Sequence, residues 1–308
     1  MVRIIAFLVG LFFAGMALLA FVVNGAAAIK SPAEPTASEE FHLASKPLHL
    51  ASDGPFGKFD NRQLQRGFQI YKEVCSNCHN LHQVAFRDLK EIGYSDAEVK
   101  AIAKQWANKQ PTKDEKTGDA GTRDNLPSDR FPTVYYPGQG NPPDLSLITK
   151  AREGGAAYVH SLLTGYTDEA TFKNPKGELL LKKFPDAKTP DGLYFNPYFA
   201  NLNLAMPQPL TQDGQVTYAP GNPKPTVDQM ARDVSAFLVW TAEPKLEERH
   251  RYGLVALAIL VIGSLLGFFA YKETWRSVKY APVAPIGPLD PETKEKTTRA
   301  RKKAGVAS

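Results

Sequence analysis

The stretch "YKEVCSNCHNLHQ" (Tyr71–Gln83) contains both cysteines of a 308-residue chain. Cys75 and Cys78 are three positions apart, and His79 follows the second cysteine directly. Two thiols and an imidazole within about one helical turn can act on a single ligand, because side chains at this spacing share one face of the helix. The function of the chain therefore depends on which ligand this pattern can hold.

Four kinds of site use a close cysteine pair, and the sequence separates them. A structural zinc site needs four ligands, and no second Cys/His pair at finger spacing follows. A thioredoxin-type redox pair follows a strand, whereas this pair follows a helical pattern. A disulfide between Cys75 and Cys78 would leave His79 unexplained. The remaining interpretation is covalent attachment of haem c, in which each thiol bonds one vinyl group and His79 binds the iron.

One haem c leaves the sixth coordination position of its iron to be assigned. Met206 lies in "LAMPQPL", where two prolines favour a rigid extended segment that can hold a thioether against a metal. Met230 lies on the apolar face of a helical pattern and is expected in the core. His82 is too close to His79 to reach the opposite haem face, so His160 is the alternative ligand. Ligation by histidine and methionine favours a one-electron carrier over a peroxidase or an oxidase.

Residues 1–28 have the composition of a secretory signal. Arg3 precedes an apolar run at residues 4–23, and the small residues "NGAAA" follow. The run is also long enough to span a bilayer, so a retained anchor stays open as an alternative to a cleaved signal peptide. Both interpretations predict that the following domain, residues 29–251, is exported.

A second apolar segment, residues 252–271, is predicted to be a transmembrane helix, because it contains no charged residue. The tail at 272–308 has nine basic and four acidic residues, which predicts a cytoplasmic location by the positive-inside rule. The tail is proline-rich, and we expect it to be disordered. Since it accounts for the net charge of +5, the exported domain is nearly neutral and its charge does not favour nucleic acid.

The exported domain is predicted to be mostly helical, with long loop insertions and almost no strand pattern. A helical period that starts at Asn61 runs into the cysteine segment. Two further helices are predicted by the spacing of capping boxes, at Ser95/Glu98 and at Thr226/Gln229. Two short helices are expected on either side of the pair Gly154 and Gly155. Residues 108–130 and 167–191 are expected to be loops.

The blocks along the exported domain resemble the cytochrome c1 family of ubiquinol–cytochrome c oxidoreductase (cytochrome bc1) complexes, of the alphaproteobacterial or mitochondrial type. The resemblance covers roughly residues 56–280 and rests on "VCSNCHNLHQVAFRDL", "PPDLSLITKAREGGAAYVHSLLTGY", "GLYFNPYFANLNLAMPQPL" and "DVSAFLVWTAEP", in the order that the family shows. CxxCH alone is common to c-type cytochromes, whereas the later blocks together are specific.

The resemblance implies a c-type cytochrome fold with one covalently bound haem c. His79 and Met206 would be the axial ligands of its iron. Arg152 would hold a haem propionate, Tyr158 would lie against the haem edge, and Pro143 would pack on the haem. These roles are implied by the positions of the residues in the family's blocks.

The resemblance also implies a function and a location. The chain would carry single electrons from the Rieske iron–sulfur protein to a cytochrome c, beside cytochrome b in a dimeric complex of the respiratory chain. Its haem domain would lie in the periplasm, attached to the bacterial inner membrane, and it would not be an enzyme by itself. From the residues alone, a haem-c subunit of a terminal oxidase or periplasmic dehydrogenase and a haem peroxidase or sensor remain alternatives.

Overall fold

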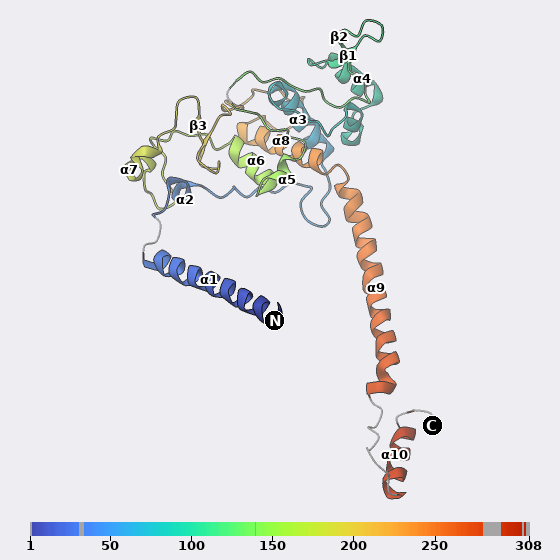
Figure 1. The fold of residues 1–308 in the computed structure, drawn as a ribbon. Helices are drawn as coiled ribbons and strands as arrows, with labels where there is room; N and C mark the ends of the chain where they lie inside the picture. Colours follow the sequence, from blue (N-terminus) through green and yellow to red (C-terminus); the bar gives the residue numbers. More distant parts are fainter. Residues whose placement is uncertain (1, 31–33, 139, 280–290, 304, 306–308) are drawn as a thin grey trace. The chain divides into compact units, whose positions relative to one another are not determined.

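The computed structural model describes residues 2–30, 34–138, 140–279, 291–303 and 305. The chain divides into two compact units, Met1–Ala51 with Phe59–Pro244 and Ser52–Lys58 with Lys245–Ser308. The first unit is mostly helical, as predicted (Figure 1). All of the predicted site residues fall within its residue ranges. Its elements are α1 (Val2–Lys30), α2 (Ala37–Phe41), α3 (Asn61–Glu73), η1 (Cys75–Asn77), η2 (Phe86–Ile92), α4 (Asp96–Gln105), β1 (Gln110–Lys113), β2 (Ala120–Arg123), α5 (Ile148–Ala151), α6 (Gly155–Leu163), α7 (Leu180–Lys183), η3 (Pro185–Ala187), β3 (Tyr194–Phe195), β4 (Asn203–Leu204) and α8 (Val227–Ala242).

The core of the first unit is built on the crossing of α3 and α8. Helix α3 begins after Asp60, whose carboxylate accepts the backbone N–H groups of Arg62 and Gln63 at 3.0 and 3.4 Å. At the crossing, a Cβ atom added to Gly67 would lie 2.2 Å from the carbonyl oxygen of Asp233. A residue without a side chain is therefore required at position 67 for the two helices to approach this closely.

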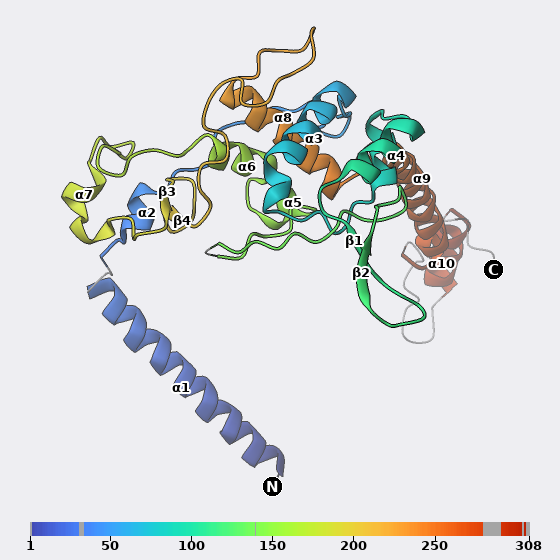
Figure 2. The ribbon, with the colours of Figure 1, turned by 90° about the horizontal axis from the view of Figure 1, so that it is seen from above.

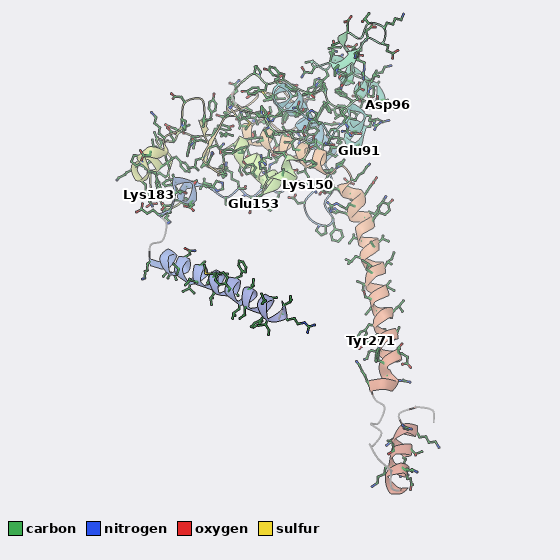
Figure 3. The ribbon with its side chains drawn as sticks, in the orientation of Figure 1. Glu91, Asp96, Lys150, Glu153, Lys183 and Tyr271 are labelled. Atoms are coloured by element: carbon green, nitrogen blue, oxygen red, sulfur yellow. The ribbon has the colours of Figure 1, made fainter. Side chains whose placement is uncertain are left out.

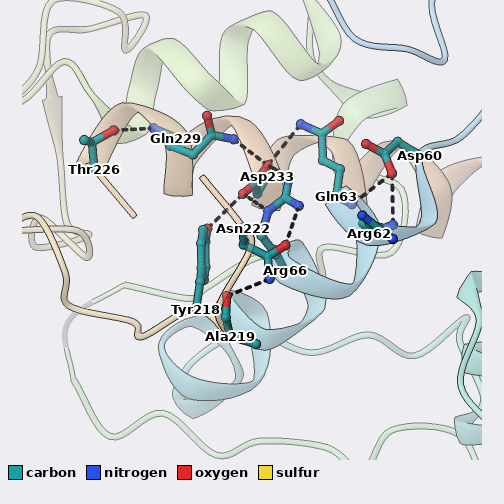
Figure 4. A network of polar contacts seen from close by, with 10 residues as sticks. All are labelled: Asp60, Arg62, Gln63, Arg66, Tyr218, Ala219, Asn222, Thr226, Gln229 and Asp233. Atoms are coloured by element: carbon teal, nitrogen blue, oxygen red, sulfur yellow. Dashed lines mark hydrogen bonds and ion pairs between the residues drawn. The ribbon is translucent and has the colours of Figure 1, made fainter. Parts of the chain in front are cut away.

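Asp233 is fully buried at this crossing and accepts hydrogen bonds from several side chains (Figure 4). Arg66 on α3 donates its Nε to Oδ2 at 2.8 Å and its Nη2 to Oδ1 at 3.1 Å. Tyr218 donates its hydroxyl at 2.9 Å, and the amides of Gln63 and Gln229 donate at 3.0 and 2.8 Å. The network compensates the buried charge and joins both helices to the loop that precedes α8.

The two predicted capping boxes have different outcomes. Ser95 accepts the N–H of Glu98 at 3.3 Å, and the Glu98 carboxylate accepts the N–H of Ser95 at 2.8 Å, which confirms the first box. Thr226 accepts the N–H of Gln229 at 3.1 Å, but the Gln229 side chain donates to Asp233 instead of returning to the cap. The prediction of a second capping box is therefore wrong, because the bond from the Thr226 N–H to the Gln229 side chain is not formed. The Gln229 side chain turns instead toward the Asp233 carboxylate, which is a stronger hydrogen-bond partner than the backbone of the cap.

The segments that were expected to be loops contain short elements. In the first, β1 and β2 form an antiparallel hairpin with Gln110 opposite Arg123, and its strands are almost entirely exposed. Figure 2 shows this hairpin projecting beside α4. In the second, α7 contributes Leu180 to a small separate core with Phe41 and Phe195. No hydrophobic period marks these elements, because they are very short and bury few side chains.

Two helices among the described residues are long and apolar enough to cross a membrane, Val2–Ala26 within α1 and Leu246–Arg276 within α9. Helix α9 (Leu246–Lys279) forms most of the second unit and extends beyond the predicted span at both ends. Tyr271 marks the end of that predicted span on α9 in Figure 3. The helix is longer because the charged residues that flank the apolar segment also favour helix.

Part of the tail forms a helix, whereas its proline-rich sequence predicts disorder. Helix α10 (Pro291–Lys303) begins at a proline, and its last turn contains Arg301, Lys302 and Lys303. A proline in the first turn and cations in the last turn both stabilise a helix, since they suit its unpaired N–H groups and its dipole. Residues 280–290 of the tail lie outside the described part of the chain.

Candidate haem site

The CxxCH segment forms a tight turn directly after α3. The helix ends at Glu73, and the cysteine segment continues as the 3-10 turn η1. The carbonyl oxygen of Cys75 accepts the N–H groups of Cys78 and His79 at 3.1 and 2.9 Å. This local geometry holds two thiols and the imidazole within one turn, as the spacing predicted.

The two cysteines are free thiols. Burial, with a smaller contribution from Cys78, raises the pKa of the Cys75 thiol to about 12. Redox-active cysteine pairs have lowered pKa values, because their chemistry requires a thiolate at neutral pH. The environment of Cys75 therefore argues against a thioredoxin-type pair.

The imidazole of His79 is oriented by a backbone acceptor. Its Nδ1 lies 2.8 Å from the carbonyl oxygen of Pro143, and because a carbonyl only accepts, Nδ1 is the donor. Burial lowers the pKa of His79, against the opposing effects of the Pro143 bond and Asp144, so the ring is favoured in its neutral form. The other nitrogen, Nε2, then carries the lone pair that a metal requires. The buried hydroxyl of Tyr71 also donates to the His79 carbonyl at 3.0 Å.

Met206 is half-buried and follows strand β4. Its side chain packs against the same core that Cys75 and Tyr158 contact. The hydroxyl of Tyr166 donates to the Met206 carbonyl oxygen at 2.9 Å. Burial raises the pKa of Tyr166, and Tyr158 contributes to this shift. The hydrogen bond from Tyr166 therefore holds the Met206 segment against the residues that directly follow α6.

The loop that contains Pro143 connects the surroundings of the two predicted axial ligands. At one end, a Cβ atom added to Gly140 would lie 3.2 Å from the Cβ of Ala205, the neighbour of Met206. At the other end, the Pro143 carbonyl accepts the His79 bond. Segments that are more than 120 residues apart in the sequence therefore meet around one loop.

Arg152 and Tyr158, two residues predicted from the resemblance, lie close together. The chain turns at Gly154 and Gly155, whose φ angles of 80° and 53° are rare for other residues. Arg152 is exposed and donates to the carbonyl of Ala151 at 3.2 Å, and its charge opposes the rise in the pKa of Tyr158 that burial causes. Lys150 and Glu153 mark the same turn in Figure 3. An exposed guanidinium next to a half-buried phenol suits an anionic group at the edge of a site.

The alternative ligands are engaged elsewhere. His160 is buried, and its Nε2 lies 3.0 Å from Oδ1 of Asp228. Its Nδ1 is buried without a hydrogen-bond partner. Met230 has no exposed surface and belongs to the main core, which confirms the expected packing role.

Three residues that hold the site were not predicted from the sequence. Tyr71 and Tyr166 donate to the backbone carbonyls of His79 and Met206, and Asp144 joins the Pro143 loop to the segment after the CxxCH turn. The sequence carries no signal for such contacts, because each joins a side chain to a distant or irregular backbone segment.

These residues fit a covalently bound haem c. Both thiols are free, His79 keeps Nε2 available while Nδ1 is engaged, and a half-buried thioether packs on the same core. Two thiols, an imidazole and a thioether form the donor set of a haem that is attached through CxxCH and ligated by histidine and methionine. The fold and the site together define a helical c-type cytochrome domain with a membrane-capable helix.

Comparison with known proteins identifies the family. The model of the cytochrome C1 family matches residues 50–278. The chain is 39% identical over 243 residues to "Cytochrome c1" of Rhodospirillum rubrum, covering 74% of this chain and 86% of that protein. It is 37% identical over 255 residues to "Cytochrome c1, heme protein, mitochondrial" of Saccharomyces cerevisiae, covering 80% and 77%. This chain belongs to the cytochrome c1 family.

A further relative is a longer protein. "Cytochrome b/c1" of Bradyrhizobium diazoefficiens is 41% identical over 238 residues, which covers 72% of this chain. The chain spans about a third of that relative's length, since the match covers 34% of it. The family and both types of relative, bacterial and mitochondrial, agree with the resemblance inferred from the sequence.

Proposed function

We propose that this chain is the haem-c subunit of a ubiquinol–cytochrome c oxidoreductase and carries single electrons from the Rieske iron–sulfur protein to a cytochrome c. The family match supports this assignment. Two relatives also have names that refer to cytochrome b, "Cytochrome b/c1" and "Cytochrome b-c1 complex catalytic subunit, mitochondrial" of Candida albicans. The chain performs no bond-making chemistry itself, and the catalysed reaction belongs to the complex.

The residues of the site have distinct roles in this proposal. Cys75 and Cys78 would form the covalent attachment, and His79 and Met206 would bind the iron. The haem, when bound, supplies an iron that alternates between the ferric and ferrous states. An imidazole and a thioether that both bind the iron would leave no position for oxygen or peroxide, and this favours electron transfer. Arg152 would hold a propionate, whereas Tyr158 and Pro143 would line the haem.

The membrane arrangement is also part of the proposal. Helix α9 anchors the chain in a bacterial inner membrane beside cytochrome b, and the haem domain lies in the periplasm. Residues 1–28 act as a signal peptide, and the basic tail is cytoplasmic. The apolar spans of α1 and α9 and the basic residues after α9 support this arrangement. The complex is a dimer that contains the Rieske protein.

The observation that carries the proposal is the CxxCH turn with His79 Nδ1 bonded to Pro143, since it leaves Nε2 for iron. The test is purification of the full-length protein from membranes, followed by a haem stain after denaturing electrophoresis and a reduced spectrum. We expect a covalent haem-c band that is lost in the Cys75→Ala/Cys78→Ala variant, and co-purification with cytochrome b. Absence of covalent haem would overturn the proposal. Co-purification with a copper–haem oxidase would assign the chain to a terminal oxidase instead.

A further inference from the structure

Asp144 lies where the Pro143 loop meets the segment that follows the CxxCH turn. Its Oδ2 accepts the backbone N–H of His82 at 2.9 Å and lies 2.8 Å from Nδ1 of the same histidine. Its Oδ1 accepts the N–H of Ser146 at 2.8 Å. Burial opposes the charge, but the bonds from Ser146 and His82 outweigh it and lower the pKa of Asp144. The carboxylate is therefore ionised at neutral pH and holds both segments at once.

Other contacts keep the same two segments in register. The N–H of Leu145 donates to the carbonyl of Asn80 at 2.9 Å, and the N–H of Gln83 donates to the hydroxyl of Ser146 at 3.0 Å. The other ring nitrogen of His82, Nε2, forms a hydrogen bond with Oγ1 of Thr133 at 3.1 Å. Among these contacts, the one between Asp144 and His82 joins two ionisable side chains, and we call these two residues the Asp144–His82 pair.

The Asp144–His82 pair controls the position of the Pro143 carbonyl through covalent geometry. The carbonyl of Pro143 and the N–H of Asp144 belong to one planar peptide group. The proline ring fixes φ of Pro143, so this peptide group turns about ψ of Pro143 and φ of Asp144, and the anchored Asp144 side chain restrains the residue on the second side. Any displacement of Asp144 therefore turns the oxygen that accepts the His79 bond.

We propose that Asp144 and His82 are positioning residues that set the strength of the hydrogen bond from His79 Nδ1 to Pro143 and thereby the reduction potential of the haem. This inference rests on the proposed function, because it requires His79 to bind the haem iron. A strong bond from Nδ1 raises the basicity of the imidazole. A more basic ligand donates more charge to the iron and stabilises the ferric state, so the pair lowers the potential.

The direction in which the reduction potential changes distinguishes this positioning role from a general disruption of the haem site. If the Asp144–His82 pair is removed, the bond to Pro143 weakens, and we expect the potential to rise. If a variant instead displaces Met206, we expect the potential to fall, because thioether ligation raises it. Entry of water would also favour the more highly charged ferric site and lower the potential.

The test uses the full-length, haem-loaded protein in detergent and measures the midpoint potential from the haem absorption during a redox titration. The variants are Asp144→Ala, Asp144→Asn and His82→Ala. The control is Asp129→Ala, because Asp129 likewise accepts a loop N–H, that of Leu126 at 2.8 Å, and pairs with Arg123. The described contacts of its carboxylate are with Arg123 and Leu126, outside the CxxCH turn, and we therefore expect a wild-type potential.

We expect an upward shift that is largest for Asp144→Ala and smaller for His82→Ala, which keeps the backbone bond to the carboxylate. Asp144→Asn retains acceptor oxygen and should recover part of the wild-type value. The ferric spectrum should stay low-spin in all variants. An unchanged or lowered potential in both Asp144→Ala and His82→Ala would overturn the inference. If the Asp144→Ala variant does not load haem, the midpoint potential of His82→Ala alone tests the inference. A wild-type protein without covalent haem would instead overturn the proposed function.

Discussion

Nε of Arg66 and Oδ2 of Asp233 lie 2.8 Å apart across the crossing of α3 and α8, and the Asp233 side chain has no exposed surface. The Arg66 side chain is itself only 11% exposed, and the helix that carries it, α3, leads directly into the CxxCH turn. The ion pair therefore connects the stability of the domain to the position of the haem site.

Removal of Arg66 should strongly destabilise the domain. An Arg66→Ala variant leaves a buried carboxylate without its cation, and the expected loss in the free energy of unfolding is about 3–5 kcal/mol. Urea unfolding followed by tryptophan fluorescence measures it. The control is Lys90→Ala, because Lys90 pairs with Asp96 at 2.8 Å on the exposed surface. Equal stability of the two variants would contradict a structural role for the buried pair.

Replacement of Met206 should change the haem without releasing it. In Met206→Leu the thioether bonds from both cysteines remain, but the iron loses an axial ligand, so its potential falls and ferric high-spin bands appear. Carbon monoxide, which the reduced wild-type protein should not bind readily, should bind the variant. Met230→Leu is the matched control, because Met230 is fully buried in the core. If the wild-type ferric protein is already high-spin, the assignment of Met206 is wrong.

His160 should make the stability depend on pH below neutrality. Burial lowers the pKa of His160, Arg232 and Lys46 act in the same direction, and Asp228 opposes them. The unfolded chain, with an ordinary histidine pKa of about 6.5, therefore binds a proton at higher pH than the folded chain. Stability is present above about pH 6.5 and is lost as the pH falls from there toward the lowered folded value.

The measurement is the melting temperature between pH 5 and 8 for the wild type and for His160→Gln, which keeps a donor for Asp228. The difference between the two proteins isolates this histidine from the others in the chain. We expect the wild type to lose more stability than the variant on acidification. Parallel curves would show that His160 does not titrate on unfolding in this range.

The membrane attachment should depend on α9. A chain that stops after Pro244 lacks this helix, and we expect it in the soluble periplasmic fraction with residues 1–28 removed. A chain that stops after Lys279 keeps α9 but lacks α10, and it should remain in the membrane. Fractionation and determination of the mature N-terminus test both expectations. Membrane retention of the shorter chain with an intact N-terminus would identify α1 as a second anchor.

Much of the fold was predictable because local patterns specify it. The periodic apolar residues of α3 and α8, the Ser95 cap and the uncharged segment in α9 each indicate an element within a few turns of chain. The hairpin β1–β2 and helix α7 were missed, because they are stabilised by local pairing or by a small separate core. The bond of Gln229 was also missed, since a buried acceptor on the same helix outcompetes the cap.

The sequence by itself indicated the chemistry that we propose for this protein, because CxxCH places two thiols and an imidazole within one turn whatever surrounds them. It also indicated Met206, because Pro207 and Pro209 follow it closely and favour a rigid extended segment. Only the tertiary structure decided how these groups are held. The bonds of His79 to Pro143, of Met206 to Tyr166 and of Asp144 to His82 join segments that are 40 to 64 residues apart. Such contacts depend on how the chain folds back on itself, and no local pattern of residues encodes them.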